Sequence, residues 1–167
     1  MKQAQHRLTV PTRGAGLYEF TEAASDFVRG SQIQNGLLTC FIRHTSASLV
    51  IQENADPDVL KDMKDFFAYI ATHGMNYRHT AEGPDDMPSH IRSALTQTSI
   101  GIPLQRGRLA LGTWQGIYVF EHRDAPHRRE VMLHVIGLTF FVIPAKAGIH
   151  LQAIVVGWKV GCPLPRA

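Results

Sequence analysis

The stretch from Arg43 to Val59, "RHTSASLVIQENADPDV", decides how the first half of this chain is read. Its apolar centre, residues 49–51, is typical of a strand. Asp56 can cap a following helix, and Pro57 suits the first helical position. The stretch therefore predicts a strand, a turn and a helix. It leaves open whether the polar residues around the strand form a site or only a well-capped junction.

On the C-terminal side, the sequence predicts a helix over 57–71, a loop over 72–87 and a second helix from Pro88. Asp58 favours the positive end of the first helix. The residues expected in the buried stripe of the first helix are Val59, Met63, Phe66, Phe67 and Ile70. Those expected to face inward from the second helix are Ile91, Ala94 and Leu95.

On the N-terminal side, residues 2–10 predict a strand that Pro11 and a glycine-bearing turn close. A helix is expected over 21–30, with Thr21 as its N-cap and Ala24, Phe27 and Val28 on its apolar face. "NG" at 35–36 predicts a turn before a strand over 37–44. From Ser99 onward the pattern is all strand, at 99–104, 108–114, 116–123 and 130–137. The fold class is α+β, with helices packed on a sheet that lies mostly in the second half.

Composition restricts the class of protein. The 167 residues suffice for one domain, and 44% hydrophobic with 19% charged residues is a globular composition. The net charge is +3 without a block of Lys or Arg, so we expect no nucleic-acid partner. Nine histidines favour a metal or acid–base site.

The cellular compartment follows from cysteine use and apolar runs. Cys40 and Cys162 lack CxxC spacing, which fits a reducing cytoplasm better than a disulfide framework or zinc knuckle. The N-terminus lacks the apolar core of a signal peptide. The longest apolar stretch, 135–158, is broken by polar residues and Pro144, so we expect no membrane association.

Two further stretches gather polar side chains. "YRHTAEGPDDMPSH", residues 77–90, contains His79, Glu82, Asp85, Asp86 and His90. These types can bind a metal or form an acid–base pair, although the spacing is not HExxH and a solvated loop is the alternative. "GRLALGTWQGIYVFEHR", residues 107–123, offers an aromatic wall and a polar floor beside three glycines, or plain strand packing. Arg123, Arg128 and Arg129 follow, as phosphate ligands or as a solvated turn.

With "HTSASLVIQENADPDVLKDMKDFF" at 44–67, these stretches resemble the YjbQ family, known for a secondary thiamine-phosphate synthase activity. The resemblance covers roughly residues 3–138, where we expect a single domain. Gln52 stands where the family usually has asparagine. Residues 139–167 fall outside the family and are expected to be a peripheral or poorly ordered extension.

The resemblance implies a mostly antiparallel, sandwich-like α+β domain in a homotrimer with sites near subunit boundaries. It implies transfer of a pyrimidine diphosphate onto a thiazole phosphate, releasing pyrophosphate. For this reaction we expect the charge of the diphosphate to be neutralised by arginines or by a divalent metal (Mg or Zn) held by Glu82 and Asp86. "HTS" and "EN" would form one wall of the site and the loop ending in His90 the other. The implied catalytic residues are His44, Glu53, Glu82, Asp86 and His90. The implied substrate-binding residues are Thr45, Ser46, Asn54, Thr113, Trp114 and Gln115. To these we add, from the residue types, Arg129 as a substrate-binding residue and His79, His90 and His44 as candidate metal ligands.

Two rival hypotheses remain beside the transferase. The chain is then either a trimer that binds a metal or small metabolite without catalysis, or a metal-assisted hydrolase of phosphate compounds.

Overall fold

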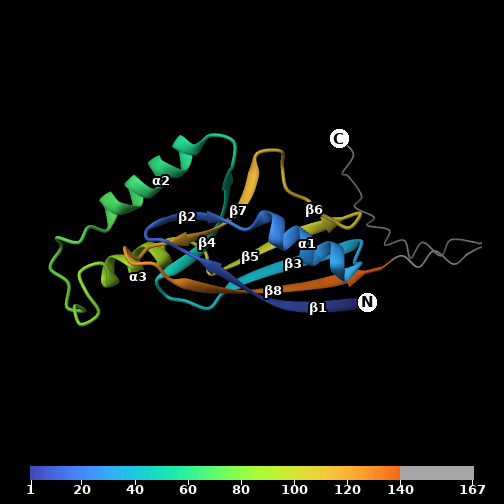
Figure 1. The fold of residues 1–167 in the computed structure, drawn as a ribbon, viewed down its shortest axis with the longest axis horizontal. Helices are drawn as coiled ribbons and strands as arrows, with labels where there is room; N and C mark the ends of the chain where they lie inside the picture. Colours follow the sequence, from blue (N-terminus) through green and yellow to red (C-terminus); the bar gives the residue numbers. More distant parts are fainter. Residues whose placement is uncertain (140–167) are drawn as a thin grey trace, which may run out of the picture.

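The computed structural model describes residues 1–139, which form two antiparallel sheets and three helices (Figure 1). The larger sheet has the order β1-β8-β3-β5-β6 and the smaller one β2-β7-β4. The strands of the larger sheet are β1 Lys2–Pro11, β8 Arg128–Leu138, β3 Asn35–Ile42, β5 Ser99–Gln105 and β6 Arg108–Leu109. Those of the smaller sheet are β2 Gly16–Glu19, β7 Gln115–Glu121 and β4 Ala47–Glu53. The helices are α1 Thr21–Ser31, α2 Pro57–Ile70 and α3 Asp86–Ala94. The predicted α+β class is confirmed.

The core lies between the two sheets and under α1. Alternation along β3 turns Leu38, Cys40 and Ile42 inward, where they are buried, while Leu37 and Phe41 stay exposed on the outer face. Leu49 of β4 and Ile117 and Val119 of β7 join the same cluster from the smaller sheet. Apolar residues from both sheets thus share one interior, which is the expected sandwich-like arrangement.

The predicted strand at 2–10 and helix at 57–71 are confirmed almost to the residue. The carboxylate of Asp56 accepts a hydrogen bond from the backbone N–H of Asp58 at 2.9 Å. Pro57 occupies the first turn, as expected. The "DPDV" part of the opening stretch is therefore a helix start that needs no functional explanation.

The inward face predicted for α2 is correct in direction, because Val59, Met63, Phe67 and Ile70 are half-buried, but the face predicted for α3 is wrong. No residue of α2 is fully buried, and Phe66 is 59% exposed, because the helix stands away from the sheets (Figure 1). Its main anchor is Phe67, whose ring packs edge-on against Phe120 at 5.2 Å between centroids. In α3, Ile91 is only half-buried and Ala94 and Leu95 are exposed. The face of α3 that packs inward is polar, with Ser89, Arg92 and Ser93 buried.

Two local predictions near α1 are also wrong. The hydroxyl of Thr21 accepts from the backbone N–H of Ile117 in β7, so Thr21 is the first helical residue and not a cap. Asn35-Gly36 begins β3 instead of forming a turn, because Gly36 lies directly opposite Gly137 of β8. A Cβ on Gly36 would lie 2.1 Å from the carbonyl oxygen of Ile136, which explains the glycine.

Further differences concern short strands and the tail. The strand predicted over 108–114 is reduced to β6, and β2 was not predicted. None of the helices in residues 1–139 has the length and hydropathy needed to cross a bilayer. The extension predicted from 139 onward lies, apart from its first residue, outside the described residues.

Candidate metal centre at the start of α3

Two histidines and one aspartate meet at the N-terminal end of α3. Ligand atoms of His79, Asp86 and His90 all lie within 4.8 Å of one another. Oδ2 of Asp86 is 2.7 Å from Nε2 of His79 and 3.3 Å from Nε2 of His90. Asp86 and His90 are four residues apart, so one helical turn places them on the same face. His79 reaches them from the loop before α3.

The orientation of His90 is fixed by a backbone carbonyl. Its Nδ1 lies 3.0 Å from the carbonyl oxygen of Thr45, which can only accept, so Nδ1 carries the proton. The lone pair on Nε2 of a neutral His90 then faces a carboxylate oxygen of Asp86. Two lone pairs repel, so this geometry needs a proton or a metal ion between the two groups. A ligating histidine whose other nitrogen donates to a carbonyl is the usual outer-shell arrangement of metal sites.

Arg123 holds the acidic side of the cluster. It pairs with Oδ1 of Asp86, donates through Nε to Asp85 at 2.9 Å, and donates to the carbonyl of Glu82 at 2.9 Å. Burial alone would raise the pKa of Asp85, but the hydrogen bonds from Arg123 and from the backbone of Asp124 outweigh it and lower that pKa. With Oδ1 of Asp86 occupied by Arg123, its Oδ2 is the oxygen that faces the histidines. Because the guanidinium of Arg123 already binds these carboxylates and holds them in place, it is not free to bind phosphate.

The three side chains fit a catalytic type of metal site. Ligands of a tetrahedral zinc at about 2.1 Å are about 3.4 Å apart, a separation within reach of small side-chain shifts here. The side chain of Asp86 is 2% exposed, whereas those of His79 and His90 are 44% and 33% exposed. Three protein ligands with an open, solvent-facing side leave coordination positions for water or substrate. Two imidazoles favour zinc or a similar transition metal over magnesium, which prefers oxygen ligands.

The "HTS" motif at 44–46 lies beside this cluster and contacts it through a backbone carbonyl. The carbonyl of Thr45 meets His90, and the carbonyl of Ser46 lies 3.5 Å from a guanidinium nitrogen of Arg129. Nε2 of His44 accepts the backbone N–H of Glu130 at 2.8 Å, so its remaining nitrogen carries the proton. His44 therefore has no lone pair for a metal and is not among the gathered ligands. Burial, followed by the charge of Arg129, lowers the pKa of His44.

The remaining predicted residues lie at the other end of β4. The backbone N–H of Asn54 donates to the carbonyl of Trp114 at 3.0 Å, and the indole of Trp114 is exposed. At about 3.3 Å per residue, the length of β4 puts this end roughly 20 Å from the "HTS" end. Within one chain the expected single wall of "HTS" and "EN" therefore does not form. The group at this far end comprises Glu53, Asn54, Thr113, Trp114 and Gln115.

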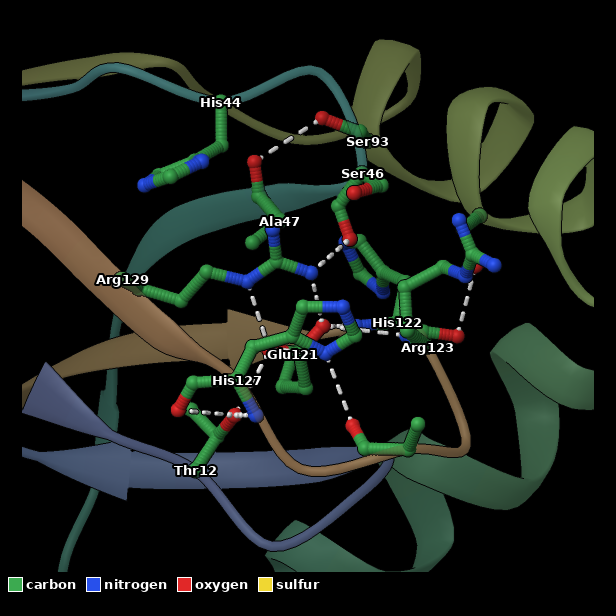
Figure 2. Close-up of polar contacts among 12 residues, drawn as sticks. Thr12, His44, Ser46, Ala47, Ser93, Glu121, His122, Arg123, His127 and Arg129 are labelled. Atoms are coloured by element: carbon green, nitrogen blue, oxygen red, sulfur yellow. Dashed lines mark hydrogen bonds and ion pairs between the residues drawn. The ribbon is translucent and has the colours of Figure 1, made fainter. Parts of the chain in front are cut away.

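Arg129, predicted to bind substrate, is instead part of a buried ion pair (Figure 2). Its Nε donates to Glu121 at 2.6 Å, and the carboxylate also accepts from the hydroxyl of Thr12 at 2.8 Å. Both charged side chains are at least 95% buried. Burial would raise the pKa of Glu121, but the hydrogen bonds from Arg129, the backbone of Arg123 and Thr12 lower it. This pair ties β7 to β8, and no guanidinium edge of Arg129 is presented to solvent.

A buried histidine next to this pair was missed from the sequence. His122 follows β7, is 1% exposed, and its Nε2 lies 2.9 Å from the hydroxyl of Ser48. Burial, and then the charge of Arg92, lowers the pKa of His122 to about 3. The available signal was the run "EHR" at 121–123, in which charged residues continue an otherwise apolar strand.

The depressed pKa of His122 makes stability depend on pH. Below about pH 6.5 the unfolded chain binds a proton at this histidine that the folded chain does not bind. Its contribution is therefore present above pH 6.5 and is lost as the pH falls toward 3. We expect the free energy of unfolding to fall by about 1.4 kcal/mol per pH unit in this range. Urea unfolding at pH 7 and pH 5 measures this loss; His122→Gln should reduce it, whereas His6→Gln at an exposed position should not.

Comparisons with known proteins agree with the fold. Residues 6–138 match the family model described as UPF0047 protein YjbQ-like. A UPF0047 protein of Synechocystis is 55% identical over 137 residues, covering 81% of this chain and 93% of the relative. The UPF0047 protein YjbQ of Escherichia coli O157:H7 is 42% identical, covering 80% and 97%. The crystal structure of a YjbQ/UPF0047 family protein from Clostridium acetobutylicum has a TM-score of 0.71 at 32% identity, covering 80% and 99%.

Proposed function

This chain belongs to the YjbQ-like UPF0047 family, and we propose that it is a metal-dependent transferase of the thiamine-phosphate synthase type. The observation that carries the metal part is the convergence of His79, Asp86 and His90 with an open side toward solvent. The substrate class comes from the family resemblance of the three motifs. The proposed reaction joins a pyrimidine diphosphate to a thiazole phosphate.

In the proposed reaction, the bond between the methylene carbon and the diphosphate oxygen breaks, and a bond from the thiazole nitrogen to that carbon forms. Pyrophosphate leaves with the electron pair of the broken bond. A bound divalent ion supplies charge neutralisation for the departing diphosphate. The chain's own part is to orient the ligands: Thr45 holds His90 through its carbonyl, and Arg123 holds Asp86 through Oδ1.

A second candidate is a metal-assisted phosphohydrolase. The observation that favours it is the ligand set, because two histidines and one carboxylate with an open position are the protein ligands of zinc hydrolases. A zinc ion held by His79, Asp86 and His90 would supply a Lewis acid that promotes attack by water at neutral pH. The two candidates share the ligands and differ in the acceptor, which is the thiazole nitrogen in one and water in the other.

One experiment separates them. Purified protein, loaded with zinc or with magnesium, is given the pyrimidine diphosphate with and without the thiazole phosphate, and products are resolved by chromatography. The transferase makes thiamine phosphate, with pyrophosphate release that depends on the thiazole; the hydrolase releases phosphate or pyrophosphate without it. Activity should be lost in His90→Ala and kept in His6→Ala, an exposed histidine outside the cluster. Equal activity in wild type and His90→Ala would contradict both candidates.

We further propose that the chain assembles as a homotrimer through the outer face of the larger sheet. Exposed Leu37 and Phe41 of β3 share this face with Ile136 and Met132, which are their partners on β8. An apolar row on an exposed sheet face is the usual mark of an interaction surface. Within one chain the residues around Trp114 lie far from the metal ligands at α3. In a trimer, the Trp114 end of one subunit could lie next to the α3 cluster of another. Light scattering, which gives the particle mass, tests the trimer.

A further inference from the structure

A cavity lies between α2 and the segment after β7, apart from the metal ligands, with both apolar and polar residues in its lining. Its volume is about 220 Å³. That equals about seven times the volume of a water molecule in the liquid. The polar side chains in its lining are Lys64, His73, Arg92, Glu121, His122 and Asp124. None of the three proposed metal ligands contributes to this lining.

The first indication of a ligand is a buried cation without an anion. Arg92 is 5% exposed, and its guanidinium donates to the carbonyls of Phe67, Ala71 and His122. Within residues 1–139 no carboxylate lies within ion-pair distance of it. Carbonyl oxygens satisfy the N–H groups, and the nearby carboxylates of Asp124 and Asp85 act on the positive charge only from beyond ion-pair distance. Buried charges are normally paired, so a cavity beside this one favours an anion.

The second indication is a buried nitrogen without a partner. Nδ1 of His122 is the one buried side-chain polar atom within residues 1–139 that lacks a hydrogen bond. The hydroxyl of Ser48 has Nε2 of His122 as its hydrogen-bond partner. If the hydroxyl donates to Nε2, only Nδ1–H is left unsatisfied; the other tautomer would leave both the hydroxyl proton and Nδ1 without partners. Nδ1 is therefore an unused donor on a residue that lines the cavity.

The third indication is the charge balance at the cavity. Lys64 of α2 adds a second cation, whose Nζ lies 4.0 Å from the exposed carboxylate of Asp65. The carboxylate of Glu121 is already neutralised by Arg129, and that of Asp124 lies 3.7 Å from Nε2 of His73. The lining thus offers two cations and a neutral donor against one partly exposed carboxylate.

We propose that this cavity binds a phosphate group, held by the charges of Arg92 and Lys64 and by the Nδ1–H of His122. Figure 2 shows His122 beside Glu121, on the chain segment that leads to Arg123. The same short segment therefore borders the phosphate cavity through His122 and holds the metal ligand Asp86 through Arg123. The proposal does not depend on the proposed transferase reaction.

The test is titration with inorganic phosphate at constant ionic strength and pH 7.5, in the presence of a chelator so that no metal contributes. Calorimetry gives the affinity, and the ¹⁵N signal of His122 Nδ1 reports the location. We expect this signal to shift on binding, with affinity about fivefold weaker in Lys64→Gln and about tenfold weaker in His122→Phe. Lys61→Gln, on the same helix but outside the lining, is the matched control and should bind like wild type.

Two outcomes would overturn the proposal: no shift of the His122 signal, or equal affinity in wild type, Lys64→Gln and His122→Phe. Asp86→Asn separates this site from the metal centre, because phosphate binding that disappears in this variant belongs to the α3 cluster. A phosphomonoester used in place of phosphate distinguishes the source. If the phosphomonoester binds more tightly than inorganic phosphate, the ligand of the cavity is a phosphorylated metabolite. If it binds equally or more weakly, the ligand is free phosphate.

Discussion

Replacing Asp86 by asparagine is expected to weaken zinc binding by more than 100-fold. Asparagine keeps the shape of the side chain but removes the charge of the oxygen that lies 2.7 Å from His79 and 3.3 Å from His90. Changing groups that only orient metal ligands costs about 10–100-fold in affinity, and loss of a charged ligand exceeds that. Competition with a chromophoric chelator measures the affinity, and plasma emission spectroscopy measures the zinc carried by the purified protein.

Glu82→Gln is the matched control for this prediction. Glu82 lies four residues before Asp86 in the same loop, and its exposed side chain lies outside the gathered ligands. It contributes its carbonyl to Arg123, which the substitution keeps. Zinc affinity should therefore equal that of wild type. If wild type and Asp86→Asn bound zinc equally weakly, the cluster would be only a network of ion pairs around Asp86.

Replacing Arg129 by methionine is expected to lower the free energy of unfolding by about 3–5 kcal/mol. The change leaves the fully buried carboxylate of Glu121 with the hydroxyl of Thr12 and backbone N–H groups but without a counter-charge. Chemical unfolding followed by circular dichroism measures the loss. Protein concentration is held constant, because unfolding of an oligomer depends on it.

The adjacent Arg128 provides the control. Its side chain is exposed, so Arg128→Met should change the free energy of unfolding by no more than about 0.5 kcal/mol. The double substitution Arg129→Met with Glu121→Leu removes both charges and should recover much of the loss. Equal stability of Arg129→Met and Arg128→Met would mean that the buried pair contributes nothing to the fold.

Local sequence signals predicted the elements whose causes are themselves local. The start of α2 follows from Asp56 and Pro57 alone, because capping involves only the first helical turn. The strand β1 follows from its residue pattern and the proline that ends it. The loop from 77 to 90 was identified as a candidate site from its residue types, since histidine and aspartate together are the raw material of metal sites.

The predictions that differ from the structure are those that depend on which residues pack against one another. Leu95 and Phe66 fit amphipathic patterns, yet both are exposed. For Leu95 the reason is that the side chains of Arg92 and Ser93 anchor α3 through backbone carbonyls, and in α2 the contact with Phe120 is made by Phe67. Asn35-Gly36 has the signal of a turn, but a strand that returns about 100 residues later pairs with it. Hydropathy patterns contain no information about which backbone carbonyls or glycines will lie opposite a given residue.

The α+β class, the capped start of α2 and the residue types available for a metal site all follow from the amino-acid sequence. The family match rests on the sequence as well, since three long motifs carry it. Which of those residues meet depends on how the strands and helices pack. This packing joined His79, Asp86 and His90, assigned His44 and Arg129 to backbone and ion-pair contacts, and put Asn54 at the far end of β4. The physical reason is that a ligand set requires distances of a few ångströms, and in this chain strand pairing and the polar face of α3 fix those distances.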